Sequence, residues 1–242
     1  MLEQLNPRIR AIHHEEADGP TECISVMSQD FRSLSWEAIA NVPSYGEWLL
    51  ATEQRPTYEY HRRVVKLLQS RRPPDLWLFK APHHNFHLEA IASAYPDARF
   101  VMTHRDPAKS VPSWASIVST IFPAAQGERD MQRLGREVSN HLRIGVEHAI
   151  AARARLGEDR FLDVHHPRLI ADPQGTMRRI YDYLDLELRP SVEEAMLDWQ
   201  RTNRSGARGT HTYTAEQFGL STQQLRSDYD FYIRHFGVEV ES

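Results

Sequence analysis

The sequence predicts an α/β protein that has a parallel sheet, flanking helices and a high helical content. Three short apolar runs, at residues 76–80, 99–104 and 160–165, are typical of buried strands. Helical patterns separate these runs, and such alternation indicates a parallel sheet with crossover helices. Polar residues follow the first two runs, and ligands of such sheets bind outside the carboxyl ends of the strands.

The first 75 residues are predicted to be helical. Residues 20–31 indicate a short helix, and Val42-Pro43-Ser44-Tyr45 breaks the chain before Trp48. Residues 57–70 predict a longer helix, because their apolar side chains recur at i, i+4, i+7 and i+8. Arg71-Arg72-Pro73-Pro74 ends this helix, since proline cannot continue one.

The strands and their crossover helices follow. The first apolar run leads to a predicted helix at 85–95, and the second run leads to Asp106 and Pro107. Asp106 is a suitable cap and Pro107 a suitable first residue for a helix that runs to about residue 121. Further helices are predicted at 128–156, 172–184, 190–202 and 221–236.

Composition indicates one domain of ordinary soluble character. The chain has 242 residues and a net charge of −4, so it has no global attraction to nucleic acid or to anionic membranes. We expect a helical N-terminal part (1–75), an α/β nucleotide-binding core (76–185) and a helical C-terminal part (186–242). The single cysteine, Cys23, and the absence of an apolar run of membrane-spanning length predict a cytoplasmic protein that is not an integral membrane protein.

The polar segment after the second apolar run, His104-Arg105-Asp106-Pro107, has the side chains of a phosphate-binding site. Arg105 leaves the strand where its paired donors can reach past the sheet, and Ser113 lies two turns into the next helix. The nearby helix N-terminus also favours negative charge. The alternative is that Arg105 is a surface charge and Ser113 an ordinary helical residue, because this spacing is common by chance.

The polar segment after the first apolar run, Lys80-Ala81-Pro82-His83-His84, has side chains that complement a phosphate site. Lys80 can stabilise a negatively charged oxygen, and an imidazole beside it can accept a proton near neutral pH. The alternative for Lys80 is a solvated charge at a strand end. His83 and His87 are spaced i, i+4 as metal ligands can be, but no cysteine or carboxylate completes a set, so we predict no metal.

Together these stretches resemble the sulfotransferases that use 3′-phosphoadenosine 5′-phosphosulfate (PAPS), and among them the bacterial sulfotransferase family proteins. The resemblance runs through Lys80-Ala81-Pro82-His83-His84, Pro96-Asp97-Ala98-Arg99, Thr103-His104-Arg105-Asp106-Pro107 with Ser113, Phe161-Leu162-Asp163-Val164, and Ala171-Asp172-Pro173. It extends to Val42-Pro43-Ser44-Tyr45 with Trp48, and to His211-Thr212-Tyr213 with Phe218-Gly219-Leu220. The resemblance implies a P-loop NTPase-like sulfotransferase fold.

The resemblance also implies a mechanism, in which an acceptor hydroxyl attacks the sulfuryl group of PAPS in line. Lys80 is then the charge stabiliser and His84 the base, with His83 as the rival base. Arg105 and Ser113 are the ligands of the 3′-phosphate of PAPS or of its product PAP. The acceptor is a small-molecule or lipid hydroxyl, and no nucleic acid partner is implied; a homo-oligomer is left open.

The chain departs from the family in its N-terminal part. The family's glycine-containing loop for the 5′-phosphosulfate has no counterpart, since the first 75 residues contain only Gly19 and Gly46. We therefore expect an N-terminally incomplete fold with impaired activity. A basic loop, Ser205-Gly206-Ala207-Arg208-Gly209, is a weak candidate for phosphate contact through Arg208, with a surface loop as the alternative.

Two other classes of function share part of this pattern. A non-catalytic, degenerate sulfotransferase that binds a nucleotide or a partner is the main alternative. A protein kinase is excluded, because Val111 stands where the kinase catalytic loop requires asparagine.

Overall fold

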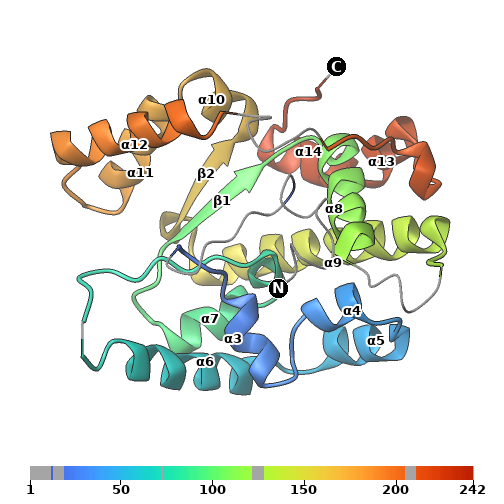
Figure 1. Ribbon diagram of the computed structural model, residues 1–242, viewed down its shortest axis with the longest axis horizontal. Coiled ribbons are helices and arrows are strands. Elements are labelled where there is room, and N and C mark those ends of the chain that lie inside the picture. The colour runs from blue at the N-terminus through green and yellow to red at the C-terminus, as the bar shows by residue number, and fades with distance from the viewer. Residues whose placement is uncertain (1–11, 13–18, 72, 122–127, 205–210, 242) are drawn as a thin grey trace.

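Residues 12, 19–71, 73–121, 128–204 and 211–241 are described by a computed structural model of the chain (Figure 1). At its centre β1 (Phe100–His104) pairs in parallel with β2 (Phe161–His165). Phe100 lies opposite Phe161, and His104 lies opposite His165. Helices cover the sheet from both sides, so the predicted α/β class with flanking helices is confirmed.

One group of helices lies below the sheet in Figure 1 and includes the long α9 (Met131–Leu156). The others of this group are α3 (Ile24–Gln29), α4 (Ser35–Ile39), α5 (Pro43–Ala51), α6 (Arg55–Leu68) and α7 (Leu88–Ala94), with the 3₁₀ turn η1 (Pro82–Phe86) before α7. Short 3₁₀ turns also precede β2 and α13, namely η3 (Glu158–Arg160) and η4 (Glu216–Phe218).

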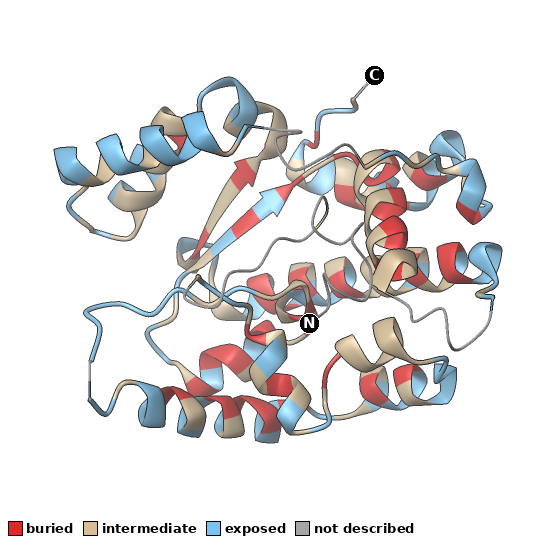
Figure 2. Ribbon diagram, viewed as in Figure 1, coloured by how far each residue is buried: buried red, intermediate tan, exposed pale blue. Residues whose placement is uncertain are grey.

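Two further groups of helices complete the fold. On the far side of β2 lie α10 (His166–Ala171), α11 (Pro173–Tyr183) and α12 (Pro190–Thr202). Beside the carboxyl end of β1 lie α8 (Pro107–Ile121), α13 (Thr222–Asp228) and α14 (Asp230–Phe236). Figure 2 shows buried residues along α8 and α9, whereas α12 is largely exposed.

Buried apolar side chains form two clusters, which share α9. The first lies among α8, α9, α13 and α14 and includes Val111, Leu134 and Tyr229. The second lies between the sheet and α7 and α9, and Met102 and Ala149 belong to it. The second cluster therefore packs against the sheet, and the first packs around α8, the helix that follows β1.

The start of α8 is built as the sequence predicts. The side chain of Asp106 accepts a hydrogen bond of 2.9 Å from the backbone N–H of Ala108, and Pro107 is the first helical residue. An aspartate at this position satisfies a donor that the helix itself cannot pair. Arg105 is thereby held between the last residue of β1 and the first turn of α8.

The predicted strand at residues 76–80 is wrong. Among the described residues only β1 and β2 form a sheet, and the carbonyl of Lys80 accepts from the N–H of Cys23 rather than from a strand. Leu78 is 86% exposed. The apolar run is extended, but its hydrogen-bonding groups have no neighbouring strand, and a strand is defined by that pairing.

Three helical boundaries also differ from prediction. Pro43 begins α5 instead of breaking the chain, because its fixed φ suits the first position of a helix. The helix predicted at 85–95 divides at His87 into η1 and α7. The helix predicted at 221–236 divides at Tyr229.

Candidate active site

Lys80 lies in the extended segment that leads into η1. Its side chain is 69% exposed, and its ammonium group pairs with the carboxylate of Glu22, just before α3. The Lys80 carbonyl accepts from the backbone N–H of Cys23 at 2.9 Å, so the backbone on both sides of this ion pair is fixed. The lysine is thus presented at the surface with a carboxylate already beside it.

His83 and His84 both lie in η1 and are both shielded from solvent. His83 is 1% exposed, and its Nε2 lies 3.0 Å from Nε2 of His87. Burial, together with the neighbouring His87 and His84, lowers the pKa of His83 well below its ordinary value. Burial, aided by His61 and His87, lowers the pKa of His84 to about 3. Both imidazoles are therefore uncharged at neutral pH.

The two ring nitrogens of His84 have different surroundings. Nδ1 lies 2.9 Å from the hydroxyl of Tyr58, a buried residue of α6. Nε2 is buried and makes no hydrogen bond to the described residues. Nε2 can take a proton only if Nδ1 already carries one and donates it to the Tyr58 hydroxyl.

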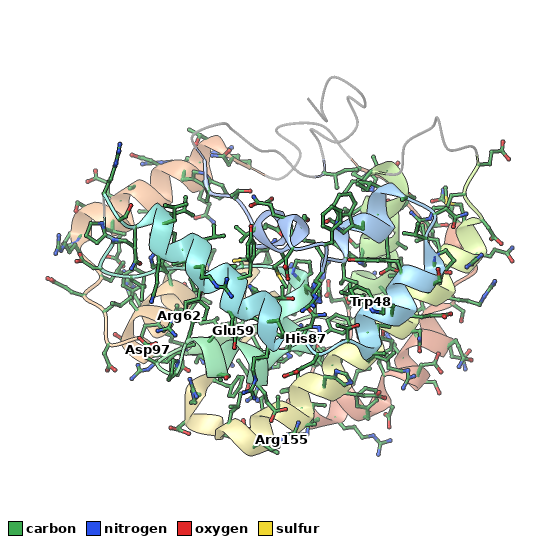
Figure 3. The ribbon with its side chains drawn as sticks, turned by 90° about the horizontal axis from the view of Figure 1, so that it is seen from below. Trp48, Glu59, Arg62, His87, Asp97 and Arg155 are labelled. Atoms are coloured by element: carbon green, nitrogen blue, oxygen red, sulfur yellow. The ribbon has the colours of Figure 1, made fainter. Side chains whose placement is uncertain are left out.

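The neighbouring His87 is visible from below in Figure 3, between α6 and α5. Glu59 and Arg62 lie on the outer face of α6 in the same view. Burial lowers the pKa of His87 to about 4. The histidines around η1 thus form a largely uncharged group on the side of the molecule that α6 covers.

Arg105 forms an ion pair with Glu241, which lies in the C-terminal segment that follows α14 (residues 237–241). Its Nε and Nη2 donate to the two carboxylate oxygens of Glu241 at 2.9 and 3.0 Å. The hydrogen bonds with Glu241 raise the pKa of Arg105 and lower that of Glu241. Such a bidentate pair is the geometry in which arginine binds carboxylates and phosphates. Arg105, which the sequence predicts to bind a phosphate, therefore binds an anion in this structure, and that anion is the carboxylate of Glu241 in the same chain.

Asp106 and Arg226 hold this segment in place. Asp106 is fully buried and accepts from Arg226 Nη2 at 2.6 Å and from the backbone N–H of Glu241 at 2.9 Å. Burial alone would raise the pKa of Asp106, but these bonds lower it. The aspartate of the His-Arg-Asp-Pro motif therefore has two roles, as helix cap and as anchor of the C-terminal segment.

Ser113 is half-buried in the second turn of α8, and a small cavity links this region with η1. The cavity is about 50 Å³ in volume, and Pro82, Phe86 and Trp114 contribute to its lining. Pro82 and Phe86, which lie on either side of His83 and His84, therefore line the same cavity as Trp114, the residue after Ser113. Lys80, His83, His84, Arg105 and Ser113 are not among the residues that line this cavity. Lys80 and Arg105 each pair with a different carboxylate.

Glu37 of α4 lines the same cavity and was not identified from the sequence. Burial, with the neighbouring Glu137, raises the pKa of its carboxyl to about 7. One carboxylate oxygen lies 3.8 Å from Nδ1 of His141. A lone glutamate between apolar residues has no motif around it, so only its burial in the folded chain reveals it.

Arg208 and its glycine-containing loop lie outside the described residues. In the part of the chain that the structure does describe, no group of three or more histidine, cysteine, aspartate or glutamate side chains is placed to bind a metal ion. Nor does any helix within the described ranges combine the length and apolar character needed to cross a membrane.

Comparison with known proteins relates this geometry to a family. The sequence pattern of the Sulfotransferase family matches residues 1–190. The omega-hydroxy-beta-dihydromenaquinone-9 sulfotransferases Stf3 of Mycobacterium bovis and Mycobacterium tuberculosis are each 24% identical over 189 residues, which are 73% of this chain and 46% of each relative. The chain thus spans about half the length of these curated relatives.

Two solved structures are similar over nearly the whole chain. Sulfotransferase STF9 from Mycobacterium avium is 32% identical with a TM-score of 0.85, over 95% of this chain and 59% of that one. Sulfotransferase STF1 from Mycobacterium tuberculosis H37Rv is 30% identical with a TM-score of 0.79, over 94% of this chain and 59% of that one. With a fold and a family pattern that agree, the chain belongs to the sulfotransferase family.

Proposed function

We propose that the protein transfers a sulfuryl group from PAPS to a hydroxyl of an acceptor molecule. Arg105 and Ser113 hold the 3′-phosphate, Lys80 stabilises negative charge at the reacting oxygens, and His84 accepts the hydroxyl proton through Nε2. His83 remains the rival base. PAPS supplies an activated sulfuryl group, and the protein supplies its position and a place for the proton.

The observation that carries this proposal is the bidentate pair at the carboxyl end of β1. The guanidinium of Arg105 binds an anion there at 2.9 and 3.0 Å, beside the N-terminus of the 15-residue helix α8. Both features favour phosphate oxygens at this position. The donor set is therefore suited to the 3′-phosphate that distinguishes PAPS from other adenine nucleotides.

We propose a lipid or small-molecule hydroxyl as the acceptor. The Stf3 relatives are named for an omega-hydroxylated menaquinone, which is a lipid-like hydroxyl compound. In this chain the Nε2 of His84 is buried, and the centroid of the Tyr58 ring lies 5.7 Å from that of the His84 ring. An apolar acceptor can enter such surroundings without losing strong hydration.

A non-catalytic nucleotide-binding protein is the second candidate. Lys80 and Arg105 are both paired with carboxylates, Glu22 and Glu241, rather than left available to a substrate. A nucleotide could bind after exchange at Arg105 even if Lys80 stayed paired. This candidate predicts nucleotide binding without sulfuryl transfer to any hydroxyl.

Binding calorimetry tests the phosphate site that both candidates share. Adenosine 3′,5′-bisphosphate should bind more tightly than AMP, and Arg105→Ala should remove this preference at a cost of about 1.5–3 kcal/mol, as for charged hydrogen bonds. Arg189→Ala, at an exposed arginine before α12, is the matched control. Equal affinity of the wild type for both nucleotides would exclude Arg105 as a 3′-phosphate ligand. Transfer of radiolabelled sulfate from PAPS then separates the enzyme from the binding protein.

A further inference from the structure

The carboxylate of Glu241 lies on the donor edge of Arg105. The Nε and Nη2 groups of Arg105 donate to its two oxygens at 2.9 and 3.0 Å. Phosphate and carboxylate oxygens bind a guanidinium in the same bidentate geometry. A phosphate on this edge and the carboxylate of Glu241 therefore exclude each other.

The backbone of Glu241 is held independently of its side chain. Its N–H donates to Asp106 Oδ2 at 2.9 Å, and its carbonyl accepts from Arg226 Nη2 at 2.5 Å. Val238, three residues earlier, is buried in the cluster that contains α8 and α14. These contacts hold the backbone of Glu241 beside Arg105 independently of its carboxylate. Figure 1 shows the segment that follows α14 rising beside the ends of the strands.

The pair remains accessible to a solute and stays ionised near neutral pH. The side chains of Arg105 and Glu241 are 37% and 23% exposed. His166, whose Nδ1 lies 4.0 Å from Glu241, and Asp106 are the other titratable groups that act on the carboxylate. A phosphate that approached by the remaining donors of Arg105 would still meet the negative charge of Glu241 at close range.

We propose that Glu241 is an internal competitor of nucleotide phosphate at Arg105, so that the C-terminal segment sets how tightly the nucleotide binds. This inference rests on the proposed function, because it takes Arg105 as the 3′-phosphate ligand. Release of the carboxylate is the step that phosphate binding requires, and the backbone contacts of Glu241 return the carboxylate when the nucleotide leaves.

Glu241→Gln tests the competition with little change of shape. The backbone contacts remain, so the segment stays docked while the competing charge is removed. A partly exposed ion pair changes an equilibrium constant by up to about fivefold, and we expect adenosine 3′,5′-bisphosphate to bind roughly 2- to 5-fold more tightly to this variant. AMP, which lacks the 3′-phosphate, should change by less than about 2-fold.

Two further variants separate competition from general electrostatics. Glu239→Gln removes the same charge two residues away, from an exposed side chain, and should change the affinity by less than about 2-fold. In an Arg105→Ala background Glu241→Gln should have no effect, because the shared guanidinium is gone. The measurement is calorimetric titration of all variants at one ionic strength.

The outcomes distinguish this inference from the proposed function. If Arg105→Ala weakens binding but Glu241→Gln leaves it unchanged or weakens it, Glu241 positions the arginine and the inference is wrong. Equal tightening for both nucleotides would also overturn it. If neither the wild type nor Glu241→Gln prefers the bisphosphate, the phosphate site itself is wrong, and the inference is lost with it.

Discussion

His104 and Asp163 join the two strands through a side-chain hydrogen bond of 2.8 Å between Nε2 and Oδ1. Arg153 of α9, only 4% exposed, donates to both oxygens of the same aspartate at 2.6 and 3.0 Å. Asp163 of β2 therefore connects β1 and α9, through His104, the residue before Arg105, and through Arg153.

Asp163→Asn should destabilise the fold by about 1–3 kcal/mol, because the buried guanidinium of Arg153 loses one of its two carboxylate partners and keeps only Glu158. Thermal or urea unfolding at pH 7 measures the change. The control is Asp198→Asn, whose pair with Arg201 is mostly exposed and should contribute less than about 1 kcal/mol. Similar losses in both variants would contradict a special role for Asp163.

The same aspartate should make stability depend on acid. Burial alone would raise the pKa of Asp163, but hydrogen bonds from His104 and Arg153 lower it below its ordinary value of 3.8. A depressed folded pKa gives stability that is present above the unfolded pKa and is lost as the pH falls below it. Unfolding free energies measured between pH 6 and 2 should fall less steeply in Asp163→Asn than in the wild type.

Glu37 should act in the opposite direction. Its folded pKa is raised from 4.5 to about 7, mainly by burial, so the unfolded chain ionises first and stability declines as the pH rises from 4.5 to about 7. Glu37→Gln should remove this decline and raise the unfolding free energy at pH 8 by about 1–3 kcal/mol. At pH 4 the variant and the wild type should be nearly equal. A gain of the same size at both pH values would point to a cause other than titration.

Gly135 of α9 is expected to tolerate no side chain. A Cβ atom built there would lie 2.1 Å from the backbone oxygen of Phe218 in η4, which a rotamer change cannot relieve. Although alanine favours helices, Gly135→Ala should lower the unfolding free energy by about 1–3 kcal/mol through overpacking. Arg136→Ala, at the next and exposed position, is the control and should change it by less than about 0.5 kcal/mol.

His84→Ala should lower sulfuryl transfer by about 100-fold, the lower end of the range for general bases, because burial disfavours the imidazolium that would form. His83→Ala should have a much smaller effect. Rates with radiolabelled PAPS and hydroxylated lipids or phenols provide the measurement. If His83→Ala gave the larger loss, the roles of the two histidines would be exchanged.

The sequence predicted the elements that local residues determine. The helix from Pro107 to Ile121 was predictable because Asp106 and Pro107 are local signals, and both paired strands were predictable as apolar runs. Residues 76–80 carry the same local signal, but their pairing depends on a neighbour that a local pattern cannot supply.

The candidate site was predictable only where a motif carried it. Lys80, His84, Arg105 and Ser113 lie in recognisable motifs, and their roles remain predictions. Glu22 and Glu241 lie 58 and 136 residues from Lys80 and Arg105, with which they pair. Glu37 lines a cavity together with residues from distant parts of the chain. Single carboxylates at such separations have no sequence pattern, because the fold alone brings them together.

The length of α9 has a consequence for how the protein unfolds. Leu134 and Val138, near its start, belong to one apolar cluster, and Ala149 and Ala152, near its end, belong to the other. Melting either end of this single helix removes packing from a cluster and shortens the hydrogen-bonded ladder that supports the other. We therefore expect the N-terminal helices and the C-terminal helices to be thermodynamically coupled, so that the loss of packing in one group lowers the stability of the other.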